Sequence, residues 1–185
     1  DVQERLALEQ DLKKASAEGQ LTAFVQSQVD ASGTVIGGEL LMRWNHPVRG
    51  NVPPSRFIPV AESSGLILRM GDWMILQACE TLARLHAAGQ ELLISVNVSE
   101  RQFRQDDFVE RVLGMLAQTG APAALLILEV TESLLIEHLD DTIARMSDLV
   151  RHGVRFSIDD FGTGYSSLAY LKRLPLYELK IDKSF

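Results

Sequence analysis

The sequence has little cysteine, and it lacks both a long apolar run and a concentration of positive charge. Cys79 is the single cysteine among 185 residues, so it cannot form a disulfide within the chain, and we interpret it as a small core residue in a reducing compartment. No run of residues is long and apolar enough to cross a bilayer, and the first residues do not resemble a secretory signal. We therefore expect a soluble, cytoplasmic domain without a membrane segment.

The charge balance is acidic. The chain has 18 Lys and Arg against 25 Asp and Glu, a formal net charge of −7, and its basic residues are dispersed. Polynucleotide-binding proteins rely on clustered Lys and Arg to neutralise phosphates, so this class is disfavoured. An anionic substrate would instead need metal ions between itself and the acidic side chains.

The sequence does contain enough apolar residues for one globular domain, since 46% of its 185 residues are hydrophobic. The spacing predicts strands at 21–29, 34–42, 91–98, 123–130, 154–160 and 177–182, helices at 55–64, 72–88, 108–119, 139–152 and 166–173, and a proline-rich loop at 44–54. From residue 91 onward strands and helices alternate, which is typical of parallel β-α-β units. Polar residues end successive strands and no G-x-G-x-x-G follows a first strand, so a barrel is favoured over a doubly wound sheet.

Residues 1–20 predict an amphipathic helix with Leu6, Leu8, Leu12 and Ala15 as its apolar positions. We expect it to be a connector helix from a longer polypeptide, followed by the main domain at 21–185. An ordinary packing helix is the alternative.

The most distinctive stretch is Val154–Leu168, where a β-rich run leads into two carboxylates and a glycine-containing loop. Alternation along the strand predicts Asp159 on one face and Asp160 at the strand end. Adjacent carboxylates repel unless a cation lies between them or one is protonated. The glycines permit a tight turn, and Ser166 or Ser167 can cap the next helix. By itself, this motif is also compatible with a solvated turn.

Polar side chains recur at the predicted strand ends. In a parallel barrel these ends meet at one rim. The set comprises Glu39, Asn97, Glu129, Asp159, Asp160, Lys180 and Asp182. Its oxygen donors favour Mg²⁺ or Mn²⁺ over zinc. Two such ions about 3.5–4 Å apart can support in-line attack on phosphorus, so phosphodiester hydrolysis is the reaction class that we predict.

Each member also has a simpler interpretation. Asn97 could cap a strand end, Glu129 and Glu132 could bind backbone amides at a helix start, and Lys180 could be a surface lysine. Glu39 is the lone acid of an uncharged run and is costly to bury without a partner. Arg43, on the same side of the strand, could pair with Glu39 or with a phosphate; an exposed Glu39 on an edge strand is the alternative.

Taken together, these motifs resemble those of the EAL domain family, the bacterial cyclic di-GMP phosphodiesterases. The matching segments are Glu39-Leu40-Leu41 with Arg43, Asn97-Val98-Ser99, Glu129-x-Thr-Glu132, Asp159-Asp160 with the glycine loop up to Leu168, and Lys180-Ile-Asp182. The resemblance implies a modified TIM (β/α)8 barrel with an antiparallel first strand. Its last two strands and the glutamate that acts as general base would be missing here, so we expect the chain to be incomplete at its C-terminus.

The resemblance also implies roles for individual residues. Two Mg²⁺ or Mn²⁺ ions would be held by Glu39, Asn97, Glu129, Asp159 and Asp160, and Ca²⁺ would inhibit. Lys180 would position the attacking water with Asp182 beside it, and Glu132 would anchor the loop at 162–167. Cyclic di-GMP would lie against Gln26, Glu39, Leu41, Arg43 and Pro53, and the product would be linear 5′-pGpG. A homodimer and an upstream GGDEF or sensory domain are the implied partners.

Two other functions remain open at this point. One is a catalytically inactive receptor of the EAL type, which binds cyclic di-GMP and signals through the connector helix. The other is an unrelated barrel that uses Lys180 as a base beside a metal. The signature triplet here is Glu-Leu-Leu rather than Glu-Ala-Leu; because Leu40 points away from the side of Glu39, we expect local repacking to accommodate it.

Overall fold

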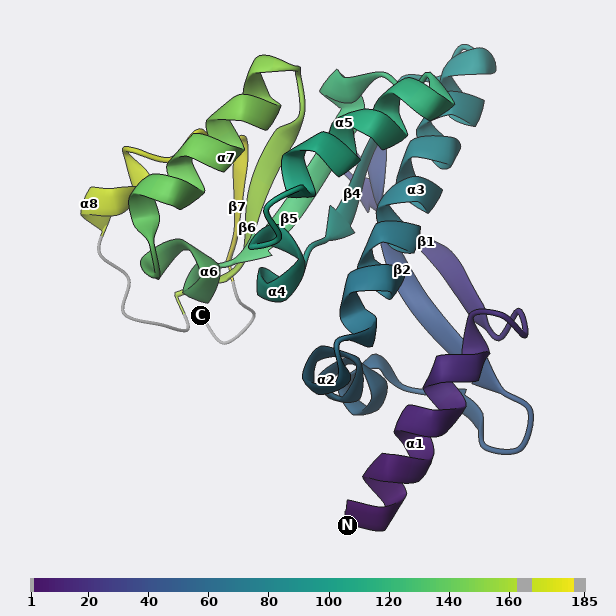
Figure 1. Cartoon of the computed structure of the whole chain (residues 1–185). Helices are drawn as coiled ribbons and strands as arrows, with labels where there is room; N and C mark the ends of the chain where they lie inside the picture. Colours follow the sequence, from purple (N-terminus) through teal and green to yellow (C-terminus); the bar gives the residue numbers. More distant parts are fainter. Residues whose placement is uncertain (1, 163–167, 182–185) are drawn as a thin grey trace.

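A mixed β-sheet forms the centre of the structure (Figure 1). The computed structural model of the chain describes residues 2–162 and 168–181. Its strands are β1 (Leu21–Val29), β2 (Val35–His46), β3 (Gly50–Val52), β4 (Leu93–Asn97), β5 (Leu126–Thr131), β6 (Arg155–Phe161) and β7 (Glu178–Ile181). The antiparallel β1 pairs with β2, after which β2, β4, β5, β6 and β7 run parallel in that order, and β3 pairs antiparallel with the end of β2. The predicted α/β class and the antiparallel first strand are thereby confirmed.

The described part of the chain also contains helices of different lengths. They are α1 (Val2–Ala15), α2 (Pro54–Ser64), α3 (Leu66–Ala87), α4 (Glu100–Phe103), α5 (Phe108–Thr119), α6 (Glu132–Ile136), α7 (Leu139–Arg151) and α8 (Leu168–Leu171), with a short 3-10 turn, η1 (Ala123–Leu125). The long helices α3, α5 and α7 lie side by side over the parallel strands (Figure 1). Each connects two neighbouring parallel strands, as the alternating sequence pattern predicts.

Side-chain alternation along the strands separates a core face from a polar face. Leu126, Leu128 and Val130 of β5 are fully buried in the core, as are Phe156 and Ile158 of β6. Glu129, between Leu128 and Val130, and Asp159, directly after Ile158, project from the opposite face. The apolar positions therefore fix the direction in which the acidic positions point.

Helix α3 is longer than the sequence predicts. We expect it to begin at Asp72, but it begins at Leu66, directly after Gly65, which has a φ of 82° and ends α2. Gly71 therefore lies inside the helix rather than before it. A Cβ at position 71 would lie 2.3 Å from Gln102 Oε1, so glycine here permits close packing rather than a helix end.

The predicted loop at 44–54 contains a strand. Strand β2 continues past the predicted end at Met42, and the fully buried Trp44 pairs with Val52 of β3. Trp44 Nε1 also donates to Gln20 Oε1 at 3.0 Å. The loop prediction was wrong here because the prolines lie outside the paired residues and do not interrupt them. The short helices α4 and α6, which follow β4 and β5, were not predicted either.

Helix α1 packs against the rest of the domain. Leu8, Leu12 and Ala15 are buried, and Asp11 Oδ2 lies 3.3 Å from His46 Nε2 at the end of β2. The helix predicted within residues 1–20 is thus present, and its role as a connector stays a prediction. None of the helices in the described part of the chain combines the length and the hydropathy that a bilayer crossing requires.

Candidate metal centre

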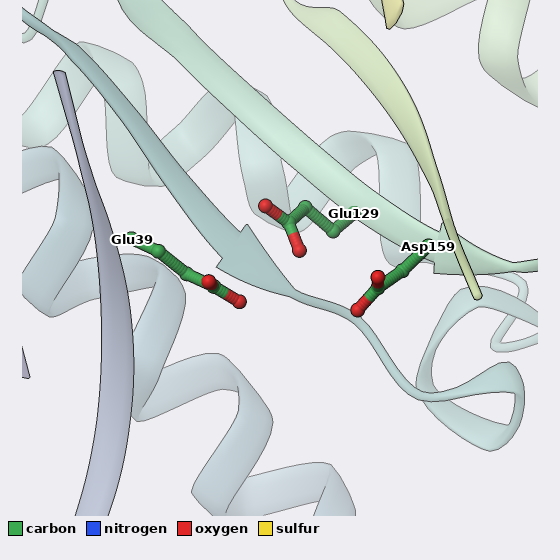
Figure 2. Close-up of side chains that lie close together, drawn as sticks. All are labelled: Glu39, Glu129 and Asp159. Atoms are coloured by element: carbon green, nitrogen blue, oxygen red, sulfur yellow. The ribbon is translucent and has the colours of Figure 1, made fainter. Parts of the chain in front are cut away.

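Three carboxylates from three strands converge on the polar face of the sheet. Figure 2 shows Glu39 of β2, Glu129 of β5 and Asp159 of β6 directed toward one another, and their candidate ligand atoms all lie within 4.8 Å of one another. Between β2 and β5 lies β4, whose last residue, Asn97, donates from Nδ2 to Glu39 Oε1 at 3.1 Å. The sheet thus gathers carboxylate and amide oxygens from segments far apart in the sequence.

The prediction that these residues end their strands holds for Asn97 but was wrong for others. Glu39 lies in the interior of β2, because this strand continues into its pairing with β3. Asp159 and Asp160 lie inside β6, which continues into a residue paired with β7. These side chains still meet at one edge of the parallel sheet, because the parallel pairing of β2 with β4 ends at Leu40, one residue beyond Glu39.

Lys180 of β7 joins the carboxylates. Its Nζ donates to Glu129 Oε1 at 2.7 Å and lies 3.4 Å from Glu39 Oε2. Its side chain is only 26% exposed, so the alternative of a surface lysine does not hold. Burial by itself would lower the pKa of Lys180, but the hydrogen bond to Glu129 and the surrounding negative charges raise it overall. Asp182, predicted to lie beside Lys180, falls outside the described residues.

Glu129 is the most strongly perturbed acid of the cluster. Its side chain has no exposed area. Burial raises the pKa of Glu129 to about 7; the charge of Glu39 acts in the same direction, whereas the hydrogen bond and charge of Lys180 oppose the shift. Near pH 7 both the charged and the uncharged form of this carboxyl group are therefore populated.

The donor set fits a divalent cation. Glu129 Oε2 is buried and has no hydrogen-bond partner among the described residues. Leaving such an oxygen unsatisfied is costly. Mg²⁺ and Mn²⁺ prefer carboxylate and amide oxygens, so either ion would satisfy it, and the absence of Cys and His from the cluster disfavours zinc.

The backbone is strained next to Asp159. Asp160 has a φ of 54°, a left-handed conformation that residues other than glycine rarely adopt, and its backbone N–H donates to Asp159 Oδ1 at 2.9 Å. This conformation interrupts the regular alternation of the strand at the two adjacent carboxylates. Strain of this kind is frequently found at functional sites.

A mainly apolar cavity of about 290 Å³ adjoins the carboxylates, and Leu41 and Arg43 of β2 are among the residues that line it. Arg43 Nη1 donates to the Met42 carbonyl at 3.1 Å, and its guanidinium lies 5.8 Å from the centre of the Phe24 ring. Glu39 is bonded instead by Asn97 and Lys180. Arg43 is therefore not paired with Glu39 in this structure, and phosphate binding by Arg43 stays a prediction.

Two other predicted groove residues, Gln26 and Pro53, do not line this cavity. Gln26 of β1 is exposed and stands opposite Glu39 in the antiparallel pair. Pro53 is exposed and immediately precedes α2, and its neighbour Pro54 lines the cavity instead. The structure thus brings Leu41 and Arg43 to the cavity wall but not Pro53.

Glu132 connects two segments near the carboxylates. It is buried at the start of α6 and accepts hydrogen bonds from the Gly162 N–H at 3.2 Å and from the Tyr170 hydroxyl at 2.8 Å. Burial and the hydrogen bond to Glu132 raise the pKa of Tyr170 to about 12, so this hydroxyl remains a donor at neutral pH. Gly162 and Tyr170 flank residues 163–167, which include the predicted cap positions Ser166 and Ser167 and lie outside the described residues.

A family model described as the EAL domain matches residues 9–185 of the chain. The chain belongs to the EAL domain family. The cyclic di-GMP phosphodiesterase NbdA of Pseudomonas aeruginosa is 44% identical over 184 residues, which cover 98% of this chain and 24% of that protein. The bifunctional diguanylate cyclase/cyclic di-GMP phosphodiesterase MucR of the same species is 43% identical over 187 residues, covering 100% of this chain and 27% of the relative. This EAL domain therefore spans about a quarter of the length of these curated relatives.

Solved EAL domain structures share its fold. A structure described as the PaMucR phosphodiesterase in complex with c-di-GMP superposes with a TM-score of 0.93 at 42% identity, over 96% of this chain and 73% of that one. The EAL enzyme Bd1971 in its cGMP-bound form gives a TM-score of 0.90 at 32% identity, over 98% and 51%. The predicted fold class, a modified TIM barrel, is thus confirmed.

Sequence reasoning missed two polar residues of this EAL domain. Tyr170 binds Glu132 across a separation of 38 residues, and no local pattern identifies that partner. Ser99 belongs to a recognised motif, yet its hydroxyl accepts from the Gln102 N–H at 3.1 Å and so caps α4. A serine just before a short helix is the signal that predicts such a cap.

Proposed function

We propose that this EAL domain hydrolyses cyclic di-GMP to linear 5′-pGpG with the help of two Mg²⁺ or Mn²⁺ ions. The observation that carries the proposal is the convergence of Glu39, Glu129 and Asp159 from three strands, with Lys180 among them. Membership of the EAL domain family and the names of the relatives NbdA and MucR support the choice of substrate.

The metal ligands in this proposal are Glu39, Asn97, Glu129, Asp159 and Asp160. When bound, two divalent cations supply a water molecule of lowered pKa and neutralise negative charge on the phosphodiester. Calcium inhibits, because it prefers more ligands at longer distances than magnesium does.

Lys180 has two roles in this proposal, one toward the attacking water and one toward the negative charge of the transition state. Its ammonium group is held between Glu129 and Glu39, and its raised pKa keeps it protonated at neutral pH. From this position it orients the attacking water and stabilises the negative charge that develops during attack. Asp182 is proposed to assist beside it.

The substrate lies against the wall of the cavity. Arg43 binds a phosphate of the dinucleotide, and Leu41 provides apolar contact from the same face of β2. Gln26, opposite Glu39 on β1, and Pro53, at the start of α2, contact the substrate from the margin.

Glu132 holds the loop at 162–167 through Gly162 at its start. In the whole protein, we propose that the EAL domain forms a homodimer and follows an upstream GGDEF or sensory domain, with residues 1–20 as the connector. The relatives MucR, named as a bifunctional cyclase and phosphodiesterase, and the Escherichia coli oxygen sensor protein DosP, 42% identical over 186 residues, support a cyclase or sensory domain in the same polypeptide.

Product analysis tests the proposal. The full-length protein is incubated with cyclic di-GMP and Mn²⁺ or Mg²⁺, and pGpG is quantified by chromatography, with chelator and Ca²⁺ as parallel conditions. We expect pGpG with Mn²⁺ or Mg²⁺ and none with chelator. Binding of cyclic di-GMP without any pGpG would instead identify an inactive receptor, and the proposal of catalysis would be rejected.

A further inference from the structure

Two arginines connect the segment after β4 to the segment after β5. Arg104, which follows α4, and Arg145 of α7 both pair with Asp141. Both side chains are largely buried, with 20% and 19% of their surface exposed. Their other contacts differ. Those of Arg104 lead toward the metal centre, whereas those of Arg145 join α7 to the segment around α4.

Arg104 binds the C-terminal end of α6. Its Nη2 donates to the carbonyls of Leu134 at 2.7 Å and Glu137 at 2.6 Å, and its Nη1 donates to the buried Thr142 hydroxyl at 2.8 Å. Helix α6 has five residues, and the chain becomes extended at Glu137, so its last carbonyls cannot accept bonds from a following turn. Arg104 satisfies these carbonyls from outside the helix.

The opposite end of α6 carries Glu132. This carboxylate accepts from the Gly162 N–H and the Tyr170 hydroxyl, and Gly162 follows Asp159 and Asp160 in the chain. A continuous set of contacts therefore runs from Arg104 through α6 to the end of β6, where Asp159 enters the carboxylate cluster.

Arg145 contacts the backbone on either side of Arg104 but does not bond α6 in the described part of the chain. Within the described residues it donates to the carbonyls of Phe103 at 3.2 Å and Gln105 at 2.6 Å, and it pairs with Asp141 on its own helix. It therefore joins α7 to the segment around α4 without bonding α6. Arg145 is a matched control for Arg104 in burial, charge and location.

We propose that Arg104 is a positioning residue of the metal centre. It fixes the C-terminal end of α6 so that Glu132, at the other end, holds Gly162 and with it the end of β6 that presents Asp159. The inference rests on the proposed metal centre and adds a residue that touches neither metal nor substrate.

Isothermal titration of the full-length protein with Mn²⁺ alone tests this assignment. We expect Arg104→Gln to weaken Mn²⁺ binding by about 10-fold, the lower range for residues that support metal ligands. Arg145→Gln should leave Mn²⁺ affinity unchanged even where thermal unfolding shows an equal loss of stability. Equal losses of affinity in both variants, or no loss in Arg104→Gln, would overturn the assignment.

A double-mutant cycle tests the path through Glu132. If Arg104 acts through this carboxylate, Arg104→Gln should cost little further affinity in a Glu132→Gln background, because the coupled groups are not additive. An undiminished cost in that background rejects the path. Amide hydrogen exchange should be faster at α6 and Gly162 in Arg104→Gln but not in Arg145→Gln.

If Arg104→Gln does not fold, the conservative variants Arg104→Lys and Arg145→Lys test the positioning role of Arg104 instead. A lysine cannot reach two carbonyls and a hydroxyl with one planar group, so Arg104→Lys should still bind Mn²⁺ more weakly than Arg145→Lys. Equal affinities reject the inference. A wild-type protein that binds no Mn²⁺ would reject the proposed metal centre itself, which is a distinguishable result.

Discussion

Glu129 contributes a wholly buried carboxylate whose pKa is raised to about 7, chiefly by burial. A carboxylate ligates a metal in its ionised form, so a proton on Glu129 competes with the cation. Below pH 7 the protonated form predominates, and above pH 7 the ionised form does. If Glu129 is a metal ligand, as we propose, acidification should therefore weaken metal binding.

Mn²⁺ binding should therefore depend on pH. Mn²⁺ affinity, measured by titration calorimetry, should fall by up to about tenfold per pH unit below pH 7 and level off above it. Measurements in buffers of different ionisation enthalpy should detect proton release on binding at pH 6 and little at pH 8. A flat affinity between pH 6 and pH 8 would contradict the role of Glu129 as a ligand.

Asp159 provides a second test at this scale. Asp159→Asn removes a charged donor from the cluster, so Mn²⁺ affinity and the rate of pGpG formation should each fall by more than about 100-fold, beyond the range for supporting residues. Asp148→Asn is the matched control, because Asp148 is a partly exposed acid of α7 paired with Arg151. Turnover at the wild-type rate in Asp159→Asn would show that Asp159 is not a ligand.

Single residues differ in how much of their role the sequence predicts. The direction of Glu129 follows from the apolar neighbours that alternate with it in β5. The continuation of β2 past Met42 does not follow, because it depends on the pairing of β2 with β3. The contact of Tyr170 with Glu132 depends on tertiary structure alone.

Among the elements, β2 and β4 approach each other closely at a glycine. A Cβ at Gly37 would lie 2.3 Å from the Leu93 carbonyl oxygen, so this parallel pair cannot accept a side chain there. Gly114, in the interior of α5, has no such neighbour within 4 Å. Gly37 therefore permits the close approach of two strands, whereas Gly114 has space for a side chain.

Alanine at each position tests this difference. Gly37→Ala should lower the free energy of unfolding by about 1–3 kcal/mol, the usual cost of overpacking. Gly114→Ala should raise it by about 0.5–1 kcal/mol, because alanine loses less conformational freedom in a helix. Chemical denaturation of both variants measures these values. A stabilised Gly37→Ala would show that β2 and β4 can separate without cost.

Helices and strands are predicted well where the hydrophobic pattern is long, and poorly where tertiary packing or strand pairing sets their bounds. The periodic segments of α5 and α7 were predicted at nearly their observed bounds. The alternation of strands with helices from residue 91 onward predicted the parallel pairing of β4 to β7. Helix α3 begins earlier than predicted because Gly71 is held inside it by packing on Gln102. The four-residue α4 and five-residue α6 are too short to show a period.

For the whole molecule, a cation in the cluster would tie β2, β5 and β6 together. A ligand that binds only the folded state stabilises it by about 2.7 kcal/mol at a concentration 100 times its Kd. We therefore expect Mn²⁺ to raise the midpoint of thermal unfolding, chelator to reverse the shift, and Asp159→Asn to abolish it. An unchanged midpoint at saturating Mn²⁺ would contradict metal binding to the folded domain.

The distribution of the candidate ligands along the chain has a practical consequence. A break in the turn between α5 and η1, at Gly120, would leave Glu39 and Asn97 on one fragment and Glu129 and Asp159 on the other. Neither fragment would carry a complete ligand set. Recovery of Mn²⁺ affinity on mixing would then report that the two halves have reassembled, so the domain could serve as a split reporter whose signal is bound manganese.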